Sequence, residues 1–227
     1  MIIAIDGTTS SGKGTLAKRL AAHYKLPHLD TGLLYRAVAA SAINKGIDFQ
    51  DERECALLAA HVELSEFDER ELRGAGVGAA ASVVASLGAV RRALFELQRK
   101  FAHQDGGAVL DGRDIGTVIA PDADVKLSVD ASVEERARRR FAELSGMGEA
   151  VTEHGVLEQL KERDARDAAR KDAPMKPADD AIWMDTTRTN PDQTLEKAIE
   201  IVEERRGAPK PAAKKMAKKA VEKKPKP

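Results

Sequence analysis

The chain has 227 residues, 42% of them hydrophobic and 33% charged, so it can bury one substantial α/β core with small inserted subdomains but not a second full domain. A single cysteine, Cys55, excludes an internal disulfide framework, and no Cys and His cluster has the spacing of a zinc site. The 37 basic and 37 acidic side chains cancel, yet eight lysines and one glutamate lie in residues 207–227, which leaves residues 1–206 mildly acidic.

The chain opens on a short apolar run, Ile2–Asp6, which predicts a buried β-strand. The run spans only a few residues before Asp6 and has no basic leader, so we interpret it as a strand and not as a signal peptide. We therefore expect a cytoplasmic protein without a membrane segment.

A glycine-rich loop follows this strand. Gly7 and Gly12 are separated by four residues and precede Lys13. This spacing lets successive backbone N–H groups point inward and, with the positive end of the next helix, hold the phosphates of a nucleotide. Lys13 would add charge at the β- and γ-phosphates. The residues expected to bind ATP are Gly7, Thr8, Thr9, Ser10, Ser11, Gly12, Lys13, Gly14 and Thr15.

The loop departs in one position from the strict phosphate-binding pattern. Gly14 stands where Ser or Thr is usual, so Thr15 has to supply the hydroxyl for Mg²⁺. An ordinary glycine-rich turn is the alternative interpretation. The order of strand, loop and amphipathic helix Lys13–Tyr24 favours phosphate binding.

Further apolar runs alternate with helical patterns and end in or beside acidic residues. This alternation predicts a parallel, doubly wound sheet, in which ligands collect beyond the carboxyl ends of the strands. The expected strands are Ile2–Asp6, His28–Asp30, Ala108–Asp111, Asp124–Asp130 and Ala181–Asp185. The acidic side chains expected at this edge are Asp6, Asp30, Asp111 and Asp185.

The tetrapeptide Asp111-Gly112-Arg113-Asp114 lies at the end of one such strand. Asp111 there can hold Mg²⁺ through water, and Arg113 can reach a substrate phosphate. A polar turn with a local ion pair is an equally open alternative.

Two helical segments are rich in arginine. Between Leu157 and about Lys171, Arg163, Arg166, Asp167 and Arg170 share one helix face that can grip anions, although surface ion pairs would give the same pattern. A second segment is so dense in positive charge that it repels itself unless a polyanion such as a nucleoside triphosphate neutralises it. Its arginines are Arg136, Arg138, Arg139 and Arg140.

The last predicted helix starts with Asn190 as N-cap and Pro191 in the first helical position. Beyond it, residues 207–227 contain mostly Ala, Lys and Pro and cannot bury enough apolar surface to become ordered. We expect a disordered, solubilising tail that contacts nucleic acid or anionic surfaces only weakly.

Taken together, these motifs resemble those of bacterial cytidylate kinases, within the nucleoside monophosphate kinases. The resemblance runs from Ile2 to about Arg206. It rests on the phosphate loop, Leu29-Asp30-Thr31-Gly32-Leu33-Leu34-Tyr35-Arg36, Ala80-Ala81-Ser82 to Val90-Arg91, Asp111-Gly112-Arg113-Asp114-Ile115-Gly116-Thr117, Pro121-Asp122-Ala123, Glu134-Glu135-Arg136-Ala137, and Lys161-Glu162-Arg163-Asp164 through Arg170.

The resemblance implies an α/β fold of the P-loop nucleoside monophosphate kinase type, with a five-stranded parallel sheet flanked by helices. One kinase domain would span residues 1–206, with a monophosphate-binding region at 31–100 and a short lid at 136–172. The implied reaction is a Mg²⁺-dependent, reversible transfer of the ATP γ-phosphoryl group to CMP or dCMP. We expect a monomer.

The resemblance also implies roles for individual side chains. Lys13, Arg113, Asp111 and the lid arginines Arg136, Arg139 and Arg140 would act in catalysis, with Thr15 and Asp111 at Mg²⁺. Thr31, Arg36, Arg113 and Arg170 would hold the acceptor phosphate, and Arg163 with Asp167 would contact phosphate and ribose. Tyr35 would pack beside the nucleoside, while Asp114 with Ser82, and Arg91, would read cytosine. The acceptor oxygen belongs to a phosphate dianion, so no general base is needed and none of the five histidines is expected to be catalytic.

One segment departs from the family. Many members insert a small antiparallel sheet near residues 62–78, which is shortened here, and Gly74, Gly76 and Gly78 weaken any helix in it. The alternatives are a kinase for UMP or AMP, a GTP-dependent switch, and a nucleic-acid-binding module led by the lysine tail. The switch needs an Asn-Lys-x-Asp guanine reader, which Asn44-Lys45-Gly46-Ile47 does not supply.

Overall fold

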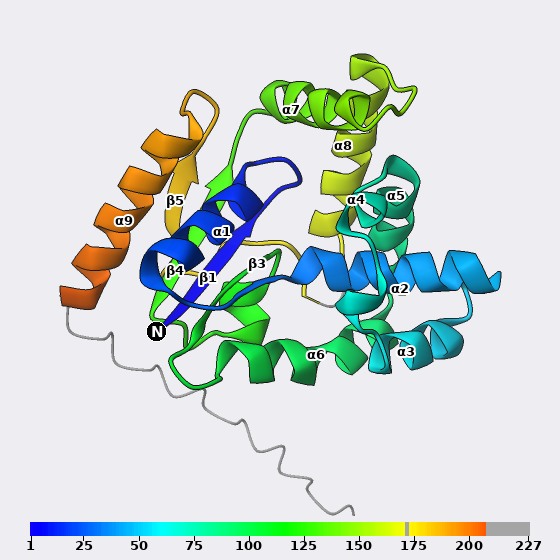
Figure 1. Cartoon of the computed structure of the whole chain (residues 1–227), viewed down its shortest axis with the longest axis horizontal. Coiled ribbons are helices and arrows are strands. Elements are labelled where there is room, and N and C mark those ends of the chain that lie inside the picture. Colours follow the sequence, from blue (N-terminus) through cyan, green and yellow to red (C-terminus); the bar gives the residue numbers. More distant parts are fainter. Residues whose placement is uncertain (171–172, 208–227) are drawn as a thin grey trace, which may run out of the picture.

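The structure is a computed structural model that describes residues 1–170 and 173–207. Within these residues a five-stranded, all-parallel sheet has the order β2-β3-β1-β4-β5 (Figure 1). The strands are β1 (Ile2–Gly7), β2 (His28–Asp30), β3 (Ala108–Gly112), β4 (Val125–Asp130) and β5 (Ile182–Asp185). The predicted strands are confirmed, and their ends differ from the prediction by no more than one residue. The expected tail falls on residues 208–227, outside the described part of the chain.

Helices connect these strands and cover both faces of the sheet. They are α1 (Lys13–Tyr24), α2 (Thr31–Lys45), α3 (Glu52–Ala60), α4 (Glu69–Leu72), α5 (Ala75–Val84), α6 (Gly88–Ala102), α7 (Val133–Gly146), α8 (Glu153–Ala168) and α9 (Pro191–Gly207). Two short turns complete the set, the 3-10 turn η1 (Leu64–Glu66) and the π-helical turn η2 (Ile115–Ile119).

Alternate residues of the central strand β1 point to two separate cores. Ile3 and Ile5 face α1 and α9, whereas Ala4 faces the side covered by α2 and α6. All three residues have no exposed surface. A strand buried on both faces needs a continuous apolar run, which explains why the Ile2–Asp6 pattern identified it.

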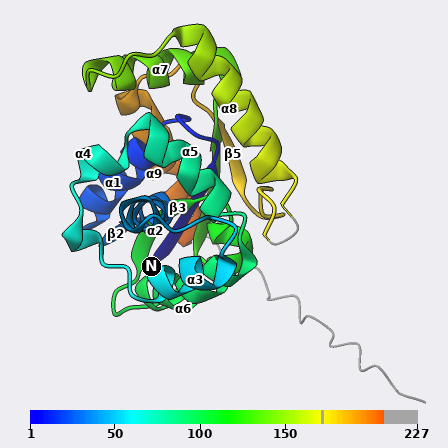
Figure 2. The same ribbon diagram turned by 90° about the vertical axis from the view of Figure 1, so that its right-hand side faces the viewer.

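The helices α7 and α8 stand above the carboxyl end of the sheet, beside α4 and α5 (Figures 1 and 2). They pack through a small apolar cluster of their own, made by Ala137, Leu144, Val156 and Leu160. The expected helix from Leu157 to about Lys171 begins earlier, at Glu153, because the Thr152 hydroxyl caps it by accepting from the Gly155 N–H at 3.1 Å. Residues 171–172 of the expected lid are not described.

Two other helix predictions can be checked directly. Helix Lys13–Tyr24 has the predicted bounds. The Asn190 cap is also confirmed, because its side-chain oxygen accepts from the backbone N–H groups of Asp192 and Gln193 at 2.9 Å each. The N-cap could therefore be predicted from the local sequence.

The segment 62–78 contains η1, α4 and the start of α5, and residues 31–107, all of them described, include no strand. Although glycine weakens a helix, Gly76 and Gly78 lie inside α5. Tertiary contacts override propensity here: the Glu149 carboxylate accepts from the Ala75 N–H at 3.0 Å, and a Cβ on Gly78 would lie 3.2 Å from the Arg36 guanidinium.

Among the described residues, no single helix has the length and apolar character needed to cross a membrane. One bent pair, α5 with α6, passes that test by length and composition, with an angle of 98° between the two helices.

Candidate active site

The loop after β1 wraps around the start of α1 in the conformation that its glycines allow. Gly12 has a φ of +88° and caps α1, in the left-handed region that glycine adopts without strain. A Cβ on Gly7 would lie 1.9 Å from the Val129 carbonyl oxygen, so no larger residue fits against β4. The backbone of the loop is therefore shaped by close packing on β4 and by the turn into α1.

A cavity of about 440 Å³ opens between this loop, the carboxyl ends of the strands and the helices α2, α6, α7 and α8. It brings together most of the side chains that the sequence singled out, although they are far apart in the chain. Those that line it are Thr9, Ser10, Gly12, Lys13, Gly14, Thr15, Thr31, Tyr35, Arg36, Arg91, Asp111, Arg113, Asp114, Arg139, Arg140, Arg163, Asp167 and Arg170.

Five predicted site residues lie elsewhere. Gly7 packs on β4, Thr8 donates a hydrogen bond to Asp130, and Ser11 is fully buried. Ser82 faces a smaller cavity of about 90 Å³ between α5 and α8. The fifth is Arg136, whose side chain is buried and points away from the cavity wall.

One side of this first cavity combines Lys13 with carboxylates at the strand ends. Burial, and then the charge of Arg113, lower the pKa of Lys13 to about 8. Burial and the nearby charge of Asp30 raise the pKa of Asp111, and the Thr31 hydroxyl donates to the Asp111 backbone carbonyl at 2.9 Å. Charges of both signs thus meet next to the phosphate loop.

A cluster of guanidinium groups forms the opposite wall. Burial and neighbouring cations lower the pKa of Arg36 to about 10 and that of Arg163 to about 9. Arg113 donates to the Thr9 hydroxyl at 2.7 Å and to Asp167 at 3.1 Å, and Arg170 pairs with the same carboxylate. Because these neighbouring guanidinium groups repel one another, a dianion bound among them would relieve their repulsion.

A third group of side chains lies at the far end of the cavity. Arg91 pairs with Asp114, and its guanidinium lies 5.7 Å from the centre of the Tyr35 ring. Ser82 was expected to act with Asp114, but its hydroxyl accepts from Arg166 at 2.9 Å instead. The structure therefore assembles an aromatic face, a carboxylate and a guanidinium at one end, without bringing Ser82 to them.

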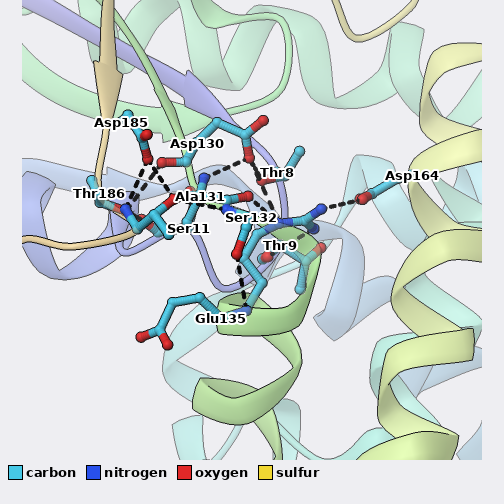
Figure 3. A network of polar contacts seen from close by, with 12 residues as sticks. Thr8, Thr9, Ser11, Asp130, Ala131, Ser132, Glu135, Asp164, Asp185 and Thr186 are labelled. Carbon is cyan, nitrogen blue, oxygen red and sulfur yellow. Dashed lines mark hydrogen bonds and ion pairs between the residues drawn. The ribbon is translucent and has the colours of Figure 1, made fainter.

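The arginines of α7 divide into two kinds. Figure 3 shows Asp164, Ala131 and Thr9 in one polar network. Arg136 donates to Asp164 at 2.6 Å, to the Ala131 carbonyl at 3.0 Å and to the Thr9 carbonyl at 3.4 Å. It fastens α7 and α8 to the phosphate loop. Arg139 and Arg140, in contrast, reach the cavity wall.

Their own partners keep these two side chains in place. Arg139 donates to the Thr186 carbonyl at 2.6 Å and pairs with Glu135 at 2.8 Å, while Arg140 donates to the Arg73 carbonyl at 2.7 Å.

The remaining two acidic strand ends are not part of the cavity wall. Asp6 accepts from the backbone N–H groups of Ile115 and Gly116 at 2.7 and 2.8 Å, and burial raises its pKa to about 7. It anchors the turn that carries Arg113 and Asp114. Asp185 is exposed and accepts from Thr187.

Sequence reasoning missed a second cavity and two contacts. The cavity, of about 620 Å³, shares Gly12, Thr15 and Arg139 with the first and extends along residues 186–191. The contacts are Arg73 to Asp30 at 3.2 Å and His28 to Asp111 at 2.8 Å. Of these, only the His28 contact could have been suspected from the sequence. His28 precedes Asp30 by two residues in the same strand, so the two side chains share one face of the sheet.

The donor set suits Mg²⁺ bound together with a nucleotide. Among the described residues there is no group of three or more His, Cys, Asp or Glu side chains placed to hold a metal. Asp111 and Thr15 both line the cavity next to Gly14, and one Asp111 carboxylate oxygen lies 3.7 Å from the place of a Cβ on Gly14. Mg²⁺ is usually bound by one or two protein oxygens with substrate phosphates and water, which this arrangement allows.

Comparisons with known proteins agree with this geometry. A family model described as "Cytidylate kinase" matches residues 3–204. A cytidylate kinase of Methylocella silvestris is 56% identical over 204 residues, which cover 89% of this chain and 94% of that protein. One of Xanthobacter autotrophicus is 55% identical over 206 residues, covering 91% of this chain and 99% of that protein.

A solved structure of an uncharacterized protein from Eubacterium ventriosum superposes with a TM-score of 0.54. It is 18% identical and covers 89% of this chain and 98% of that chain, so the likeness concerns the fold alone.

Proposed function

Because the chain belongs to the cytidylate kinase family, a group of phosphotransferases that act on CMP or dCMP with ATP as donor, we propose that the first cavity is where phosphoryl transfer takes place. One observation carries the proposal: a single cavity joins the phosphate loop to a wall of arginines and to the Arg91–Asp114 pair. It thus offers positions for donor phosphates, acceptor phosphate and base in that order.

On the donor side, residues 7–15 hold the ATP phosphates through backbone N–H groups and Lys13. The adenosine part lies in the second cavity, which borders the same loop at Gly12 and Thr15. Mg²⁺, held by the Thr15 hydroxyl and by Asp111 through water, would neutralise charge on the β- and γ-phosphates.

On the acceptor side, Thr31, Arg36, Arg113 and Arg170 hold the phosphate of CMP, and Arg163 with Asp167 contacts phosphate and ribose. Burial, and then the charges of Arg113 and Arg36, lower the pKa of Arg163, and a bound dianion would offset the part that comes from these cations. Arg113 is the link between the halves, since it contacts Thr9 of the phosphate loop as well as Asp167.

For base recognition, Tyr35 stacks beside the nucleoside while Asp114 and Arg91 read the cytosine edge. Cytosine presents an exocyclic amine and an unprotonated ring nitrogen, so a reader needs an acceptor and a donor together. The paired carboxylate and guanidinium supply both.

Catalysis in this arrangement is alignment and charge neutralisation. The attacking oxygen belongs to a phosphate dianion, so the chain needs no general base, and Lys13, Arg139 and Arg140 stabilise charge on the transferred group. The helices α7 and α8 cover the cavity and exclude water, the competing acceptor. Arg136 holds this cover in place.

The decisive experiment measures ADP formation with CMP, dCMP, UMP and AMP offered separately, for the wild type and for Asp114→Asn. We expect turnover with CMP and dCMP, and a CMP-over-UMP preference that falls roughly tenfold or more in the variant, because one acceptor oxygen is replaced by a donor. Equal preference in both proteins would contradict the base-recognition site without affecting the phosphate sites.

We also propose that the division into a monophosphate-binding region at 31–100 and a lid at 136–172 describes two mobile parts of one kinase domain. We further propose a monomer in the cytoplasm, where a chain with a single cysteine and hence no internal disulfide suits a reducing compartment. The basic residues 207–227 make only weak contacts with nucleic acid or anionic surfaces; their deletion should leave kinase activity intact.

A further inference from the structure

The side chain of His28 makes a contact that the phosphoryl-transfer scheme above does not use. Its Nε2 lies 2.8 Å from Oδ1 of Asp111, and the two side chains are only 15% and 2% exposed. The parallel pairing of β2 with β3 sets His28 opposite Val109 and Asp30 opposite Asp111. The imidazole therefore reaches along the strand direction to meet the carboxylate.

The two oxygens of Asp111 have different surroundings. Oδ1 meets the imidazole, whereas Oδ2 faces the phosphate loop, 3.7 Å from the place of a Cβ on Gly14. A carboxylate held at one oxygen loses its freedom to rotate, so the direction of the other oxygen is also set. Side chains that orient a metal-binding group in this way commonly affect metal affinity by about 10- to 100-fold.

We propose that His28 is a positioning residue, whose ring N–H holds Oδ1 of Asp111 so that Oδ2 stays directed at the metal–nucleotide complex. The inference rests on the proposed role of Asp111 at Mg²⁺. His28 itself touches neither nucleotide nor metal, and its effect is confined to the donor half of the cavity.

The chain contains a matched control for loss of a His–Asp hydrogen bond. His103 contacts Asp122 through Nε2 at 2.9 Å, but these side chains are 32% and 56% exposed and neither lines the first cavity. A general effect of removing such a contact would appear in both pairs. An effect through Asp111 would appear only at His28.

The test uses the full chain and the variants His28→Leu, His28→Gln, His103→Leu and Asp111→Asn. Calorimetry measures the dissociation constant of ATP twice, once in the presence of Mn²⁺ and once with a chelator that removes the metal. The ratio of the two constants is the metal-dependent gain in ATP affinity. In parallel, the Mg²⁺ concentration for half-maximal rate and the KM for CMP are measured. Thermal unfolding identifies any variant that has lost its fold.

We expect His28→Leu to reduce the metal-dependent gain in ATP affinity about tenfold and to raise the Mg²⁺ requirement by a similar factor. The KM for CMP should stay within about twofold, since the phosphate-binding arginines are untouched. His28→Gln keeps an N–H donor and should retain most of the gain, and His103→Leu should match the wild type.

Three results would overturn the inference. In the first, His28→Leu keeps the wild-type metal-dependent gain in ATP affinity while Asp111→Asn loses it. Asp111 would then act at the metal without any help from His28. In the second, His28→Leu and His28→Gln lose this gain equally, which would mean that the N–H donor is irrelevant. If the Leu variant does not fold, a loss of the gain in the Gln variant alone gives the same answer. A wild-type gain in Asp111→Asn refutes the metal assignment, and the inference with it.

Discussion

The two halves of the cavity are built in different ways. The proposed donor half is carried by one contiguous stretch, residues 7–15, whose backbone shape follows from glycines and from the start of α1. The proposed acceptor half collects single side chains from α2, α6, the turn after β3 and α8, and contacts between residues far apart in the chain hold them together, such as Arg113 with Asp167 and Arg91 with Asp114.

Further long-range contacts join residues 140–166 to the segment of α4 and α5. Glu149 caps the N-terminus of α5 at Ala75, and Arg140 donates to the Arg73 carbonyl. Between α8 and α5, Arg166 donates a hydrogen bond to the Ser82 hydroxyl at 2.9 Å. We therefore expect substitutions in the proposed donor half to reduce phosphoryl transfer most strongly. Substitutions in the proposed acceptor half should have smaller effects, which differ between the kinetics for CMP and those for ATP.

Lys13→Met should have the largest effect, because the lysine charge lies beside the loop that carries the phosphates. We expect kcat/KM to fall by roughly a thousandfold for both substrates, a size typical of a lost charge at a transferring phosphoryl group. Steady-state kinetics measure this, with the exposed Lys161→Met as the control. A loss below tenfold would contradict the donor site.

Arg113→Ala should separate the halves. It removes two hydrogen bonds to the cavity wall and one cation of the acceptor cluster. We expect kcat/KM for CMP to fall roughly a hundredfold, as losing about 3 kcal/mol of charged contacts implies. The ATP dissociation constant should change far less; comparable losses for both substrates would erase the proposed distinction.

Two neighbouring lid arginines should differ in kind. Arg136→Ala leaves Asp164 and the Ala131 carbonyl without their guanidinium donor, so we expect the melting temperature to fall by about 4–16 °C, for roughly 2–4 kcal/mol lost in a domain of this size. Arg139→Ala should instead lower kcat about tenfold or more with a smaller change in melting temperature. Identical profiles in differential scanning calorimetry and kinetics would refute this division.

The pH dependence of ATP binding offers a further comparison. Lys13 has a pKa of about 8, so below that pH it is already charged when phosphate arrives. Above it, binding must take up a proton, and ATP affinity should fall by up to about tenfold per pH unit. Calorimetric titration should find this slope in the wild type and a flat profile in Lys13→Arg, whose charge persists.

The smallest effect is expected for Glu149→Gln. The variant keeps one oxygen for the Ala75 N–H but loses the charge that favours a helix N-terminus. We expect the KM for CMP to rise by about two- to fivefold, as a fraction of a kcal/mol implies, with the KM for ATP unchanged. Glu158→Gln, on the exposed face of α8, is the control. A rise in the ATP KM instead would place the contact in the donor half.

Sequence reasoning did best where structure is local. The strands, helix Lys13–Tyr24 and the Asn190 cap depend on neighbouring residues, so periodicity and capping rules predicted them. It did worse for α5, where Gly76 and Gly78 suggested a weak helix. There, the contacts of Glu149 and Arg36 come from elements far away in the chain.

Contiguous motifs in the sequence were enough to predict the glycine-rich loop between β1 and α1, the parallel sheet and the family. The packing of the helices, in contrast, settles that Arg136 bonds to α8 while Arg139 reaches the cavity, since the two look alike in a row of basic residues. It also turned Ser82 to Arg166 and His28 to Asp111. A side chain's partner depends on which strands and helices pack together, and that is settled by burial of the whole core.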